Sequence, residues 1–379
     1  MKPENNYYKN LTIIFTSIIG IVFFLTIFIP DKNFSESENR VLAKSPKFSF
    51  ERLIDGRYTK KYEKYKTDQF IGRDFFMNTK ASSDLLLGKK DNNSVFLSDD
   101  GHLIENFLPI SDDKIKDNLN SINNFAKKYN NSKTYIGIVP TAISIYEDKL
   151  PSFSPIKNQI GYISRFYENL SSTITTLDIN SELKKSSNEY LYYKTDHHWT
   201  SLAANKAYNV AKDKMKLNNI ESKFEQLTVS NDFNGTLTSK SGFSTSNDNI
   251  DVYLNTNPNL KVIVTYPEAG KKSSSLYDTS KLKTKDKYSM FLSGNHPITD
   301  IRTTAETTNS IIIFKDSYAN CFIPFLTEHY SKITVIDPRY YYDDLYKLME
   351  ENKFDDILFL YNANTFFSDT SLAPVLQNQ

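Results

Sequence analysis

Residues 311–320 read IIIFKDSYAN, and this stretch decides how the rest of the chain is interpreted. Four bulky apolar residues, 311–314, have the length and branching of a buried strand, and the polar sequence KDS follows at once. Residues 318–328 can be helical at least in their first part. We therefore expect Ser317 on a strand-to-helix turn, where free backbone N–H groups and the helix dipole favour a developing negative charge.

A second polar stretch, TDHHWT at residues 195–200, contains partners for this serine. A serine hydroxyl is a weak nucleophile at neutral pH, so it needs a base, and the base needs a group that orients it. His198 is the candidate base, and Asp196 is the candidate group that orients it. Because residues two apart share a face of an extended segment, Asp196 and His198 are expected to point the same way and His197 the opposite way. The two stretches together predict a catalytic triad of Ser317, His198 and Asp196.

Helices alternate with strands along most of the chain. Helices are expected at 111–129, 159–170, 200–215 and 341–351, and strands at 134–139, 173–179, 332–336 and 356–361. This alternation predicts an α/β fold with a mostly parallel, doubly wound sheet, in which sites lie beyond the carboxyl ends of the strands. Asn362 follows the last of these strands, so its side-chain amide and the Ser317 backbone N–H are the predicted oxyanion donors.

The domain organisation follows from changes in composition. We expect a tail at 1–10, a membrane anchor at 11–30, a charged juxtamembrane segment at 31–94 and the globular domain at 95–379. A hairpin, 95–97 with 102–104, opens that domain, and an insertion of strands and long loops rich in Ser, Thr and Asn occupies about 218–300. The charged segment is equally well explained as a flexible spacer.

The anchor prediction rests on residues 11–29, which carry no charge. At about 1.5 Å per residue such a helix matches the roughly 30 Å hydrocarbon core of a bilayer. Lys2 and Lys9 precede it, which places the N-terminus in the cytoplasm and the rest outside the cell membrane as a single-pass protein. The alternative is a cleaved signal peptide, although the apolar run is longer than the 7–15 residues usual for one.

Charge and cysteine content exclude several classes of function. The 46 basic and 45 acidic residues nearly cancel, and no basic run is long enough for nucleic acid, so no nucleic-acid partner is expected. The single cysteine, Cys321, excludes an intrachain disulfide framework and any multi-cysteine metal site. No metal and no cofactor is expected, because adjacent histidines on an extended strand point apart.

Two residues of the central motif keep alternative interpretations. His197 and His198 next to Asp196 are compatible with a metal site as well as with a triad. Trp199, the only tryptophan, is a candidate to stack on a sugar ring of a substrate, and core packing is the alternative.

Five sequence segments resemble the bacterial DHHW family. They are TDHHWT at 195–200, SESENRVLAKSPKFS at 35–49, DQFIGRD at 68–74, VFLSDDGHLIE at 95–105 and KDSYANCFIPFL at 315–326. That family is similar to the SGNH-like O-acetyltransferases that modify alginate, and their Asp-x-His-Trp motif and later serine match Asp196, His198, Trp199 and Ser317. The resemblance implies an SGNH-like α/β/α sandwich with a permuted motif order. Lys315 departs from the glycine that ordinary SGNH hydrolases carry before Asp-Ser.

The resemblance also implies a function. It is that of a membrane-anchored extracytoplasmic O-acetyltransferase that modifies a cell-envelope or secreted polysaccharide and takes its acetyl group from a multi-pass membrane O-acyltransferase. Two alternatives keep the same fold. One is an esterase that deacetylates envelope polymers, and the other is a non-catalytic polysaccharide-binding or assembly protein.

Overall fold

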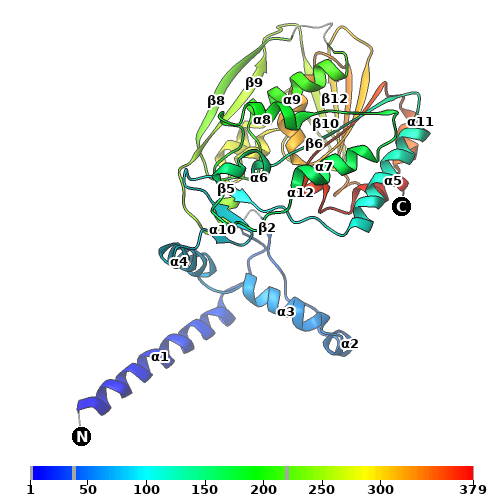
Figure 1. Ribbon diagram of the computed structural model, residues 1–379. Coiled ribbons are helices and arrows are strands. Elements are labelled where there is room, and N and C mark those ends of the chain that lie inside the picture. The colour runs from blue at the N-terminus through cyan, green and yellow to red at the C-terminus, as the bar shows by residue number, and fades with distance from the viewer. Residues whose placement is uncertain (1–2, 36–39, 218–221, 379) are drawn as a thin grey trace. The chain divides into compact units, whose positions relative to one another are not determined.

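The computed structural model describes residues 3–35, 40–217 and 222–378, and its chain divides into two compact units, Met1–Lys89 and Lys90–Gln379. Most of the sequence SESENR and the first residues of the predicted insertion lie outside the described residues. Figure 1 shows the chain coloured from blue at the N-terminus to red at the C-terminus. The division into tail, anchor, juxtamembrane segment and catalytic domain stays a prediction.

The first unit is mostly helical. Its elements are α1 (Pro3–Phe28), β1 (Phe34–Ser35), β2 (Arg40–Val41), α2 (Phe50–Ile54), α3 (Arg57–Asp68) and α4 (Arg73–Leu86). Within α1, Asn6–Phe28 is long and apolar enough to cross a membrane, and none of it is buried against the rest of the chain. A signal sequence near the N-terminus can also be long and apolar enough to meet this criterion, so both interpretations of the apolar stretch stand.

The second unit holds the sheet and the helices that cover it. Its helices are α5 (Asp112–Lys128), α6 (Ala142–Ile145), α7 (Gln159–Glu168), α8 (Ile179–Lys185), α9 (Ser201–Lys214), α10 (Thr236–Ser241), α11 (Leu345–Glu351), α12 (Ala363–Phe366) and α13 (Leu372–Gln377). Its strands are β3 (Asp91–Asn92), β4 (Val95–Leu97), β5 (Leu103–Glu105), β6 (Lys133–Val139), β7 (Ile174–Thr176), β8 (Phe224–Phe233), β9 (Asp248–Asn255), β10 (Val262–Tyr266), β11 (Lys271–Ser273), β12 (Ile298–Thr303), β13 (Ser310–Lys315), β14 (Lys332–Ile336) and β15 (Asp356–Asn362).

The central sheet has eight strands in the order β11-β10-β12-β14-β13-β15-β6-β7. From β14 to β7 neighbouring strands are parallel, whereas β12, β10 and β11 add to the other edge in antiparallel fashion. The sheet is therefore mixed, and the prediction of a mostly parallel sheet describes only its five-stranded part. The fold class, α/β, is as predicted.

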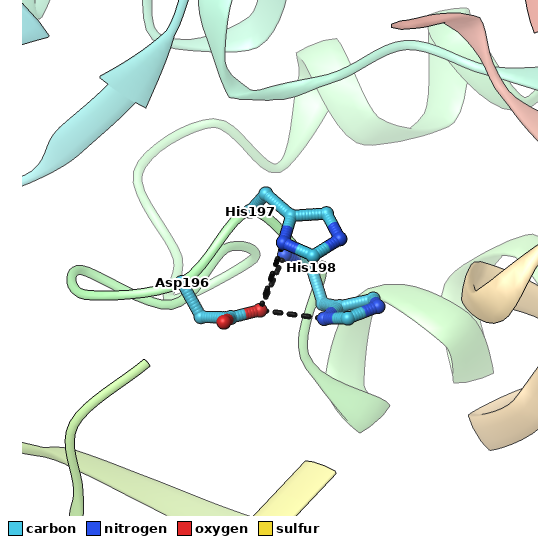
Figure 2. A group of neighbouring side chains, drawn as sticks. All are labelled: Asp196, His197 and His198. Atoms are coloured by element: carbon cyan, nitrogen blue, oxygen red, sulfur yellow. Dashed lines mark hydrogen bonds and ion pairs between the residues drawn. The ribbon is translucent and has the colours of Figure 1, made fainter. Parts of the chain in front are cut away.

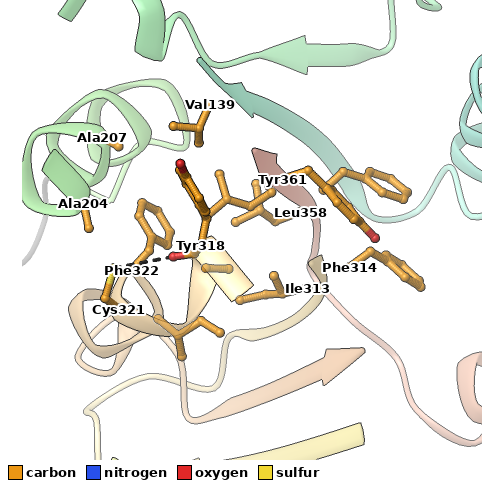
Figure 3. Packing of buried hydrophobic residues seen from close by; sticks show 14 of the residues in the cluster. Val139, Ala204, Ala207, Ile313, Phe314, Tyr318, Cys321, Phe322, Leu358 and Tyr361 are labelled. Atoms are coloured by element: carbon orange, nitrogen blue, oxygen red, sulfur yellow. Dashed lines mark hydrogen bonds between the residues drawn. The ribbon is translucent and has the colours of Figure 1, made fainter. Parts of the chain in front are cut away.

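Helices cover both faces of the sheet. On one face Phe125 of α5 packs against Phe314 and Phe359, which are register partners on β13 and β15. Because side chains alternate along a strand, Ile313 and Leu358 point to the opposite face. Figure 3 shows Ala204 and Ala207 of α9 on that second side, across from the ring of Phe314. The small alanine side chains let α9 approach the sheet closely.

The region predicted as an insertion contributes to the central sheet. Only β8 and β9 form a separate antiparallel ribbon, whereas β10, β11 and β12 join the sheet at the edge next to β14. This extension was not predicted, because short strands between long loops carry no signal for the strand with which each of them pairs. The insertion therefore enlarges the sheet at the edge next to β14, the strand that follows Ser317 in the sequence.

Two local predictions need correction. The strand expected at 173–179 covers only Ile174–Thr176, because Asp178 caps α8 through a bond from the Ser181 N–H. The segment after Ser317 contains two short 3-10 helices, Ser317–Cys321 and Ile323–Leu326. Pro324 has no N–H to donate, so it interrupts a regular helix there.

Candidate active site

The two stretches singled out in the sequence meet at the carboxyl end of β13. The Ser317 Oγ lies 2.7 Å from the His198 Nε2, although the two residues are 119 positions apart. The His198 Nδ1 lies 2.5 Å from the Asp196 Oδ1. With the Nδ1 proton donated to the carboxylate, the Nε2 lone pair faces the serine hydroxyl. The three side chains form one continuous chain of hydrogen bonds, and all three residues are buried.

A turn, and not an extended strand, brings Asp196 and His198 together. The Asp196 Oδ1 also accepts a hydrogen bond of 3.0 Å from the His198 backbone N–H, which bends the chain at this point. The prediction that His197 points the opposite way is therefore wrong. Figure 2 shows its ring beside that of His198, with the ring centroids 3.9 Å apart and the His197 Nδ1 3.5 Å from the Asp196 Oδ1.

The second oxygen of Asp196 is held from the start of α10. The Thr236 backbone N–H and hydroxyl both donate to the Asp196 Oδ2, at 2.8 and 2.9 Å. Burial of Asp196 opposes its ionisation, but the neighbouring His197 and His198 and the hydrogen bonds from His198 and Thr236 outweigh burial and lower the pKa of Asp196 well below its usual value. Asp196 is therefore a fixed anion that orients His198.

The environment of His198 favours its neutral form. Burial and the neighbouring His197 lower the pKa of His198 to about 4, against the opposing effect of Asp196. The ring also stacks on Tyr288, with the centroids 3.6 Å apart and the planes at 10°. A neutral imidazole in a fixed orientation is the form that accepts the proton of a serine hydroxyl.

Gly235 precedes Thr236 and lies so close to the carboxylate that a side chain does not fit. A Cβ at this position would lie 2.3 Å from the Asp196 Cβ and 2.5 Å from its Oδ2. We expect Gly235→Ala to lower the free energy of unfolding by about 1–3 kcal/mol, the usual cost of overpacking. Urea unfolding followed by the fluorescence of Trp199, the only tryptophan, measures the change.

Thr236→Ser is the matched control for Gly235→Ala, because it keeps the hydroxyl that donates to Asp196. This variant should unfold within about 0.5 kcal/mol of the unchanged protein. Equal stability of all three proteins would mean that the contact between residue 235 and the carboxylate is loose.

Comparison with known proteins places this arrangement in a family. The family model described as DHHW protein matches residues 91–336, more than half of the chain. The chain belongs to the DHHW family. Among curated proteins the comparison found no match.

The first two of the following similar structures share the fold of this DHHW protein. A DHHW family protein from Eubacterium siraeum is 22% identical, with a TM-score of 0.65 over 76% of this chain and 96% of that one. PatB1 of Bacillus cereus, in a structure with a sulfonyl adduct, is 20% identical, with a TM-score of 0.62 over 74% of this chain and 98% of its own. The O-acetyltransferase domain of Pseudomonas putida AlgJ is 14% identical, with a TM-score of 0.47 over 76% of this chain and 99% of that one.

Asn362 in this DHHW protein lies beside the triad but already has partners. Its side-chain N–H groups donate to the Asp316 Oδ2 at 2.6 Å and to the Thr365 Oγ1 at 2.9 Å, and its Oδ1 caps α12 by accepting from the Thr365 N–H. In this arrangement neither hydrogen of the amide is directed at a substrate. A role as oxyanion donor requires one of these bonds to be exchanged, and that role stays a prediction.

Trp199 has no exposed surface. Its indole N–H donates to the Tyr318 carbonyl at 3.0 Å, and its ring stacks on Tyr318 with the centroids 5.3 Å apart. The structure thus shows the packing alternative, in which Trp199 fixes the residue that follows Ser317. Stacking on a sugar requires the indole to become exposed.

Asp316 is an important neighbour that the sequence reasoning did not single out. Its carboxylate accepts from the Tyr318 N–H at 2.9 Å and from the Asn362 backbone N–H at 2.9 Å. Burial raises the pKa of Asp316 to about 6, although Arg339 and these N–H groups favour its ionised form. Asp316 ties the turn that carries Ser317 to the end of β15. A carboxylate directly before the serine, on the same turn, was the available signal in the sequence.

Behind this turn lies a second group of buried charges. Asp337 accepts from the Lys315 Nζ at 3.2 Å and from the Arg339 Nε and Nη2 at 2.8 and 2.6 Å. Lys315 also donates to the Asn295 Oδ1 at 2.7 Å. Lys315, which departs from the glycine expected from the resemblance, is therefore a buried ion-pair partner. We call Lys315, Asp337 and Arg339 the ion cluster.

The metal alternative can be compared with the observed geometry. Asp196, His197 and His198 bring one ligand atom each to within 4.8 Å of one another. Both ring nitrogens of His198, however, take part in the hydrogen bonds to Asp196 and Ser317. A metal ion bound by these three residues would have to replace a bond of the triad, so the two uses of His198 compete.

Proposed function

We propose that this DHHW protein is a membrane-anchored, extracytoplasmic O-acetyltransferase that acetylates a cell-envelope or secreted polysaccharide through an acetyl-serine intermediate. The observation that carries the proposal is the chain of hydrogen bonds from Ser317 through His198 to Asp196. This is the arrangement of acyl-transfer enzymes, in which the serine attacks, the histidine moves the proton and the aspartate orients the histidine. No metal or cofactor is needed for this chemistry.

The strand order supports an SGNH-like fold with a permuted chain. The parallel part of the sheet has the order β14-β13-β15-β6-β7. If β13, β14, β15, β6 and β7 are numbered 1 to 5, this order becomes 2-1-3-4-5. That is a doubly wound order, and its ligand sites lie beyond the carboxyl ends of the central strands. Ser317 follows β13 and Asn362 ends β15 at that edge. Asp196 and His198 come earlier in the sequence, which is the permuted motif order of the proposal.

The proposed reaction has two acyl transfers. In the first, Ser317 Oγ attacks the carbonyl carbon of an acetyl donor while His198 Nε2 takes the hydroxyl proton. The tetrahedral intermediate then expels the donor's leaving group, which receives that proton, and acetyl-Ser317 remains. In the second transfer a sugar hydroxyl attacks the acetyl group and gives its proton to His198. Collapse of this intermediate releases the acetylated sugar, and His198 returns the proton to Ser317.

Two further points support the proposal. PatB1, which shares the fold, has been captured as a sulfonyl adduct, and a nucleophilic serine reacts with electrophiles of this kind. The apolar part of α1 is long enough to anchor the domain at a membrane. A multi-pass membrane O-acyltransferase is the proposed source of the acetyl group, and a polysaccharide is the proposed acceptor.

The experiment for this proposal separates a transferase from a hydrolase, since the two share every step up to the acyl-enzyme. After incubation with an activated acetyl ester, mass spectrometry should find one acetyl group on Ser317. Oligosaccharides of the correct polymer should then discharge this group onto sugar hydroxyls much faster than water does. Ser317→Ala is the control and should carry no acetyl group.

Each alternative function gives a different result. An esterase would turn the ester over rapidly in water, with no dependence on sugar. A polysaccharide-binding or assembly protein would show no adduct at all. An unmodified Ser317 in folded protein would therefore contradict both enzymatic interpretations.

A further inference from the structure

Large apolar side chains are exposed in the first unit far more densely than in the second. Within the described residues, eleven of them lie between residues 41 and 87, against seven in the much longer second unit. Leu86 is 90% exposed, Ile54 74% and Phe75 68%. Such a density of exposed apolar surface is typical of a face that contacts a membrane or a protein.

These side chains are arranged on helix faces. Phe50 and Ile54 of α2 are four residues apart, so they share one face of that helix. Phe75 and Leu86 of α4 are eleven residues apart, close to three full turns, so they also share a face. We call residues 41–87 the collar. Its first and last helices, α2 and α4, are amphipathic, as expected for helices that lie in a membrane interface.

Charge is distributed unequally between the two units. Residues 1–89 contain 15 basic and 10 acidic side chains, whereas residues 90–379 contain 31 and 35. The excess of positive charge is concentrated in α3, which has five basic and two acidic residues. Anionic lipids attract such a segment by about 1 kcal/mol for each basic residue near the surface. The collar therefore complements an anionic bilayer, and the second unit does not.

Hydrogen bonds attach the collar directly to the end of α1. The Tyr65 hydroxyl donates to the Asp31 Oδ1 at 3.0 Å, and the side-chain amide of Gln69 exchanges two bonds of 2.9 Å with the backbone of Lys32. Asp31 and Lys32 follow the apolar stretch within a few residues. The collar thus begins at the level where α1 leaves a bilayer.

One hollow lies between α1 and part of the collar. It is lined by α1 residues from Ile18 to Ile27 together with Lys66 and Phe70. Phe70 also lines a second hollow with Thr26, Ile29 and Pro30, and Thr26 is two residues before Phe28, about 3 Å along the helix axis. If α1 spans the bilayer, Phe70 lies at the membrane surface. Lys66 has a long apolar stem, so its ammonium group can still reach the headgroups.

The collar also contains a row of aromatic rings. Phe48 packs edge-on against Tyr58, Tyr58 stacks on Tyr62, and Tyr62 contacts Tyr65, with centroids 5.2, 5.8 and 6.0 Å apart. Tyrosine rings with apolar bodies and polar hydroxyl groups are enriched at the level of lipid headgroups.

We infer that the collar lies in the headgroup region of the outer leaflet and that its binding partner is the lipid surface. Phe50 and Ile54 of α2 and Phe75 and Leu86 of α4 insert between lipids, while the basic residues of α3 contact lipid phosphates. This inference rests on the membrane anchor of the proposed function and adds a second, peripheral membrane contact. Such a contact holds the catalytic unit near the membrane protein that is proposed to deliver the acetyl group.

The test uses the full chain in lipid vesicles with single cysteines that carry a nitroxide spin label. Ile54→Cys and Leu86→Cys report on the collar, Ile18→Cys reports on α1, and Phe153→Cys is an exposed apolar control in the second unit, where Phe153 is 101% exposed. The native Cys321 is buried, so unsubstituted protein treated in the same way is the blank. Collision rates with oxygen and with a nickel chelate distinguish lipid from water.

We expect the ratio of oxygen to nickel collisions at residues 54 and 86 to be several-fold above that at residue 153. Addition of phosphatidylglycerol to phosphatidylcholine vesicles should raise this ratio further. If residue 18 is in lipid but residues 54 and 86 are in water, the inference about the collar fails and the anchor stands. A protein surface is then the partner of the collar. If residue 18 is also in water, the proposed anchor fails as well. Neither result affects the acylation test of Ser317.

Discussion

His198→Ala is expected to slow the acylation of Ser317 by about four orders of magnitude or more, the usual effect of removing the base of a serine nucleophile. The reason is geometric, because the His198 Nε2 is 2.7 Å from the hydroxyl whose proton must be removed. Mass spectrometry of the intact protein, sampled over time with an activated acetyl ester, gives the rate constant. Unchanged thermal unfolding shows that the variant is folded.

His197→Ala is the matched comparison, because it removes the same ring from the neighbouring position. The His197 Nδ1 lies 2.9 Å from the Thr236 Oγ1, and the side chain is 32% exposed. It contacts Asp196 only at 3.5 Å, so its loss should change the rate by about tenfold or less. Equal losses in the two variants would contradict the assignment of His198 as the base, as would no loss in either.

Asp337→Ala is expected to destabilise the second unit by about 3–5 kcal/mol, because it leaves the other members of the ion cluster without their anion. The Lys315 side chain is only 3% exposed, and its remaining close partner is the Asn295 Oδ1. Burial lowers the pKa of Lys315, whereas Asp337 favours its charged form. Urea unfolding of the full chain in detergent, followed by Trp199 fluorescence, measures the loss.

Two further variants make this prediction specific. Asp343→Ala removes an exposed aspartate from the same region and should change stability by no more than about 0.5 kcal/mol. The double variant Lys315→Met with Asp337→Leu replaces the buried pair by apolar side chains of similar size, and it should recover much of the lost stability. A loss below about 1 kcal/mol in Asp337→Ala would show that water reaches the cluster.

The hydrogen-bonded partners of Ser317 were predictable because the chemistry restricts the residue types. A serine after a buried strand and an Asp-x-His pair elsewhere suggested the triad, the resemblance to the DHHW family strengthened that prediction, and the structure brings the three side chains together. The parallel strands were predictable because buried strands are continuous apolar runs, as in β13 and β15. The antiparallel extension of the sheet was not, since pairing partners leave no local pattern.

The finer geometry of the site depends on contacts between residues distant in sequence. The alternation rule predicted opposite directions for His197 and His198, but the bond from the His198 N–H to the Asp196 side chain bends the backbone. Asn362 was predicted as a free donor, whereas Asp316, 46 positions earlier, accepts one of its amide hydrogens. Thr236 was not predicted at all, because its role exists only once Asp196 is next to it.

The strand order also determines when the fold can be completed as the chain leaves the ribosome. The central strand β15 pairs with β6, whose residues were synthesised about 220 positions earlier, and with β13. Until β15 emerges, the apolar β6 has an unpaired edge, and such edges favour aggregation during synthesis. Asp196 and His198 are likewise synthesised before Ser317, which follows His198 by 119 positions. A partly synthesised chain therefore has neither a complete sheet nor the hydrogen bond between Ser317 and His198, and chaperones that shield β6 during that interval would limit aggregation.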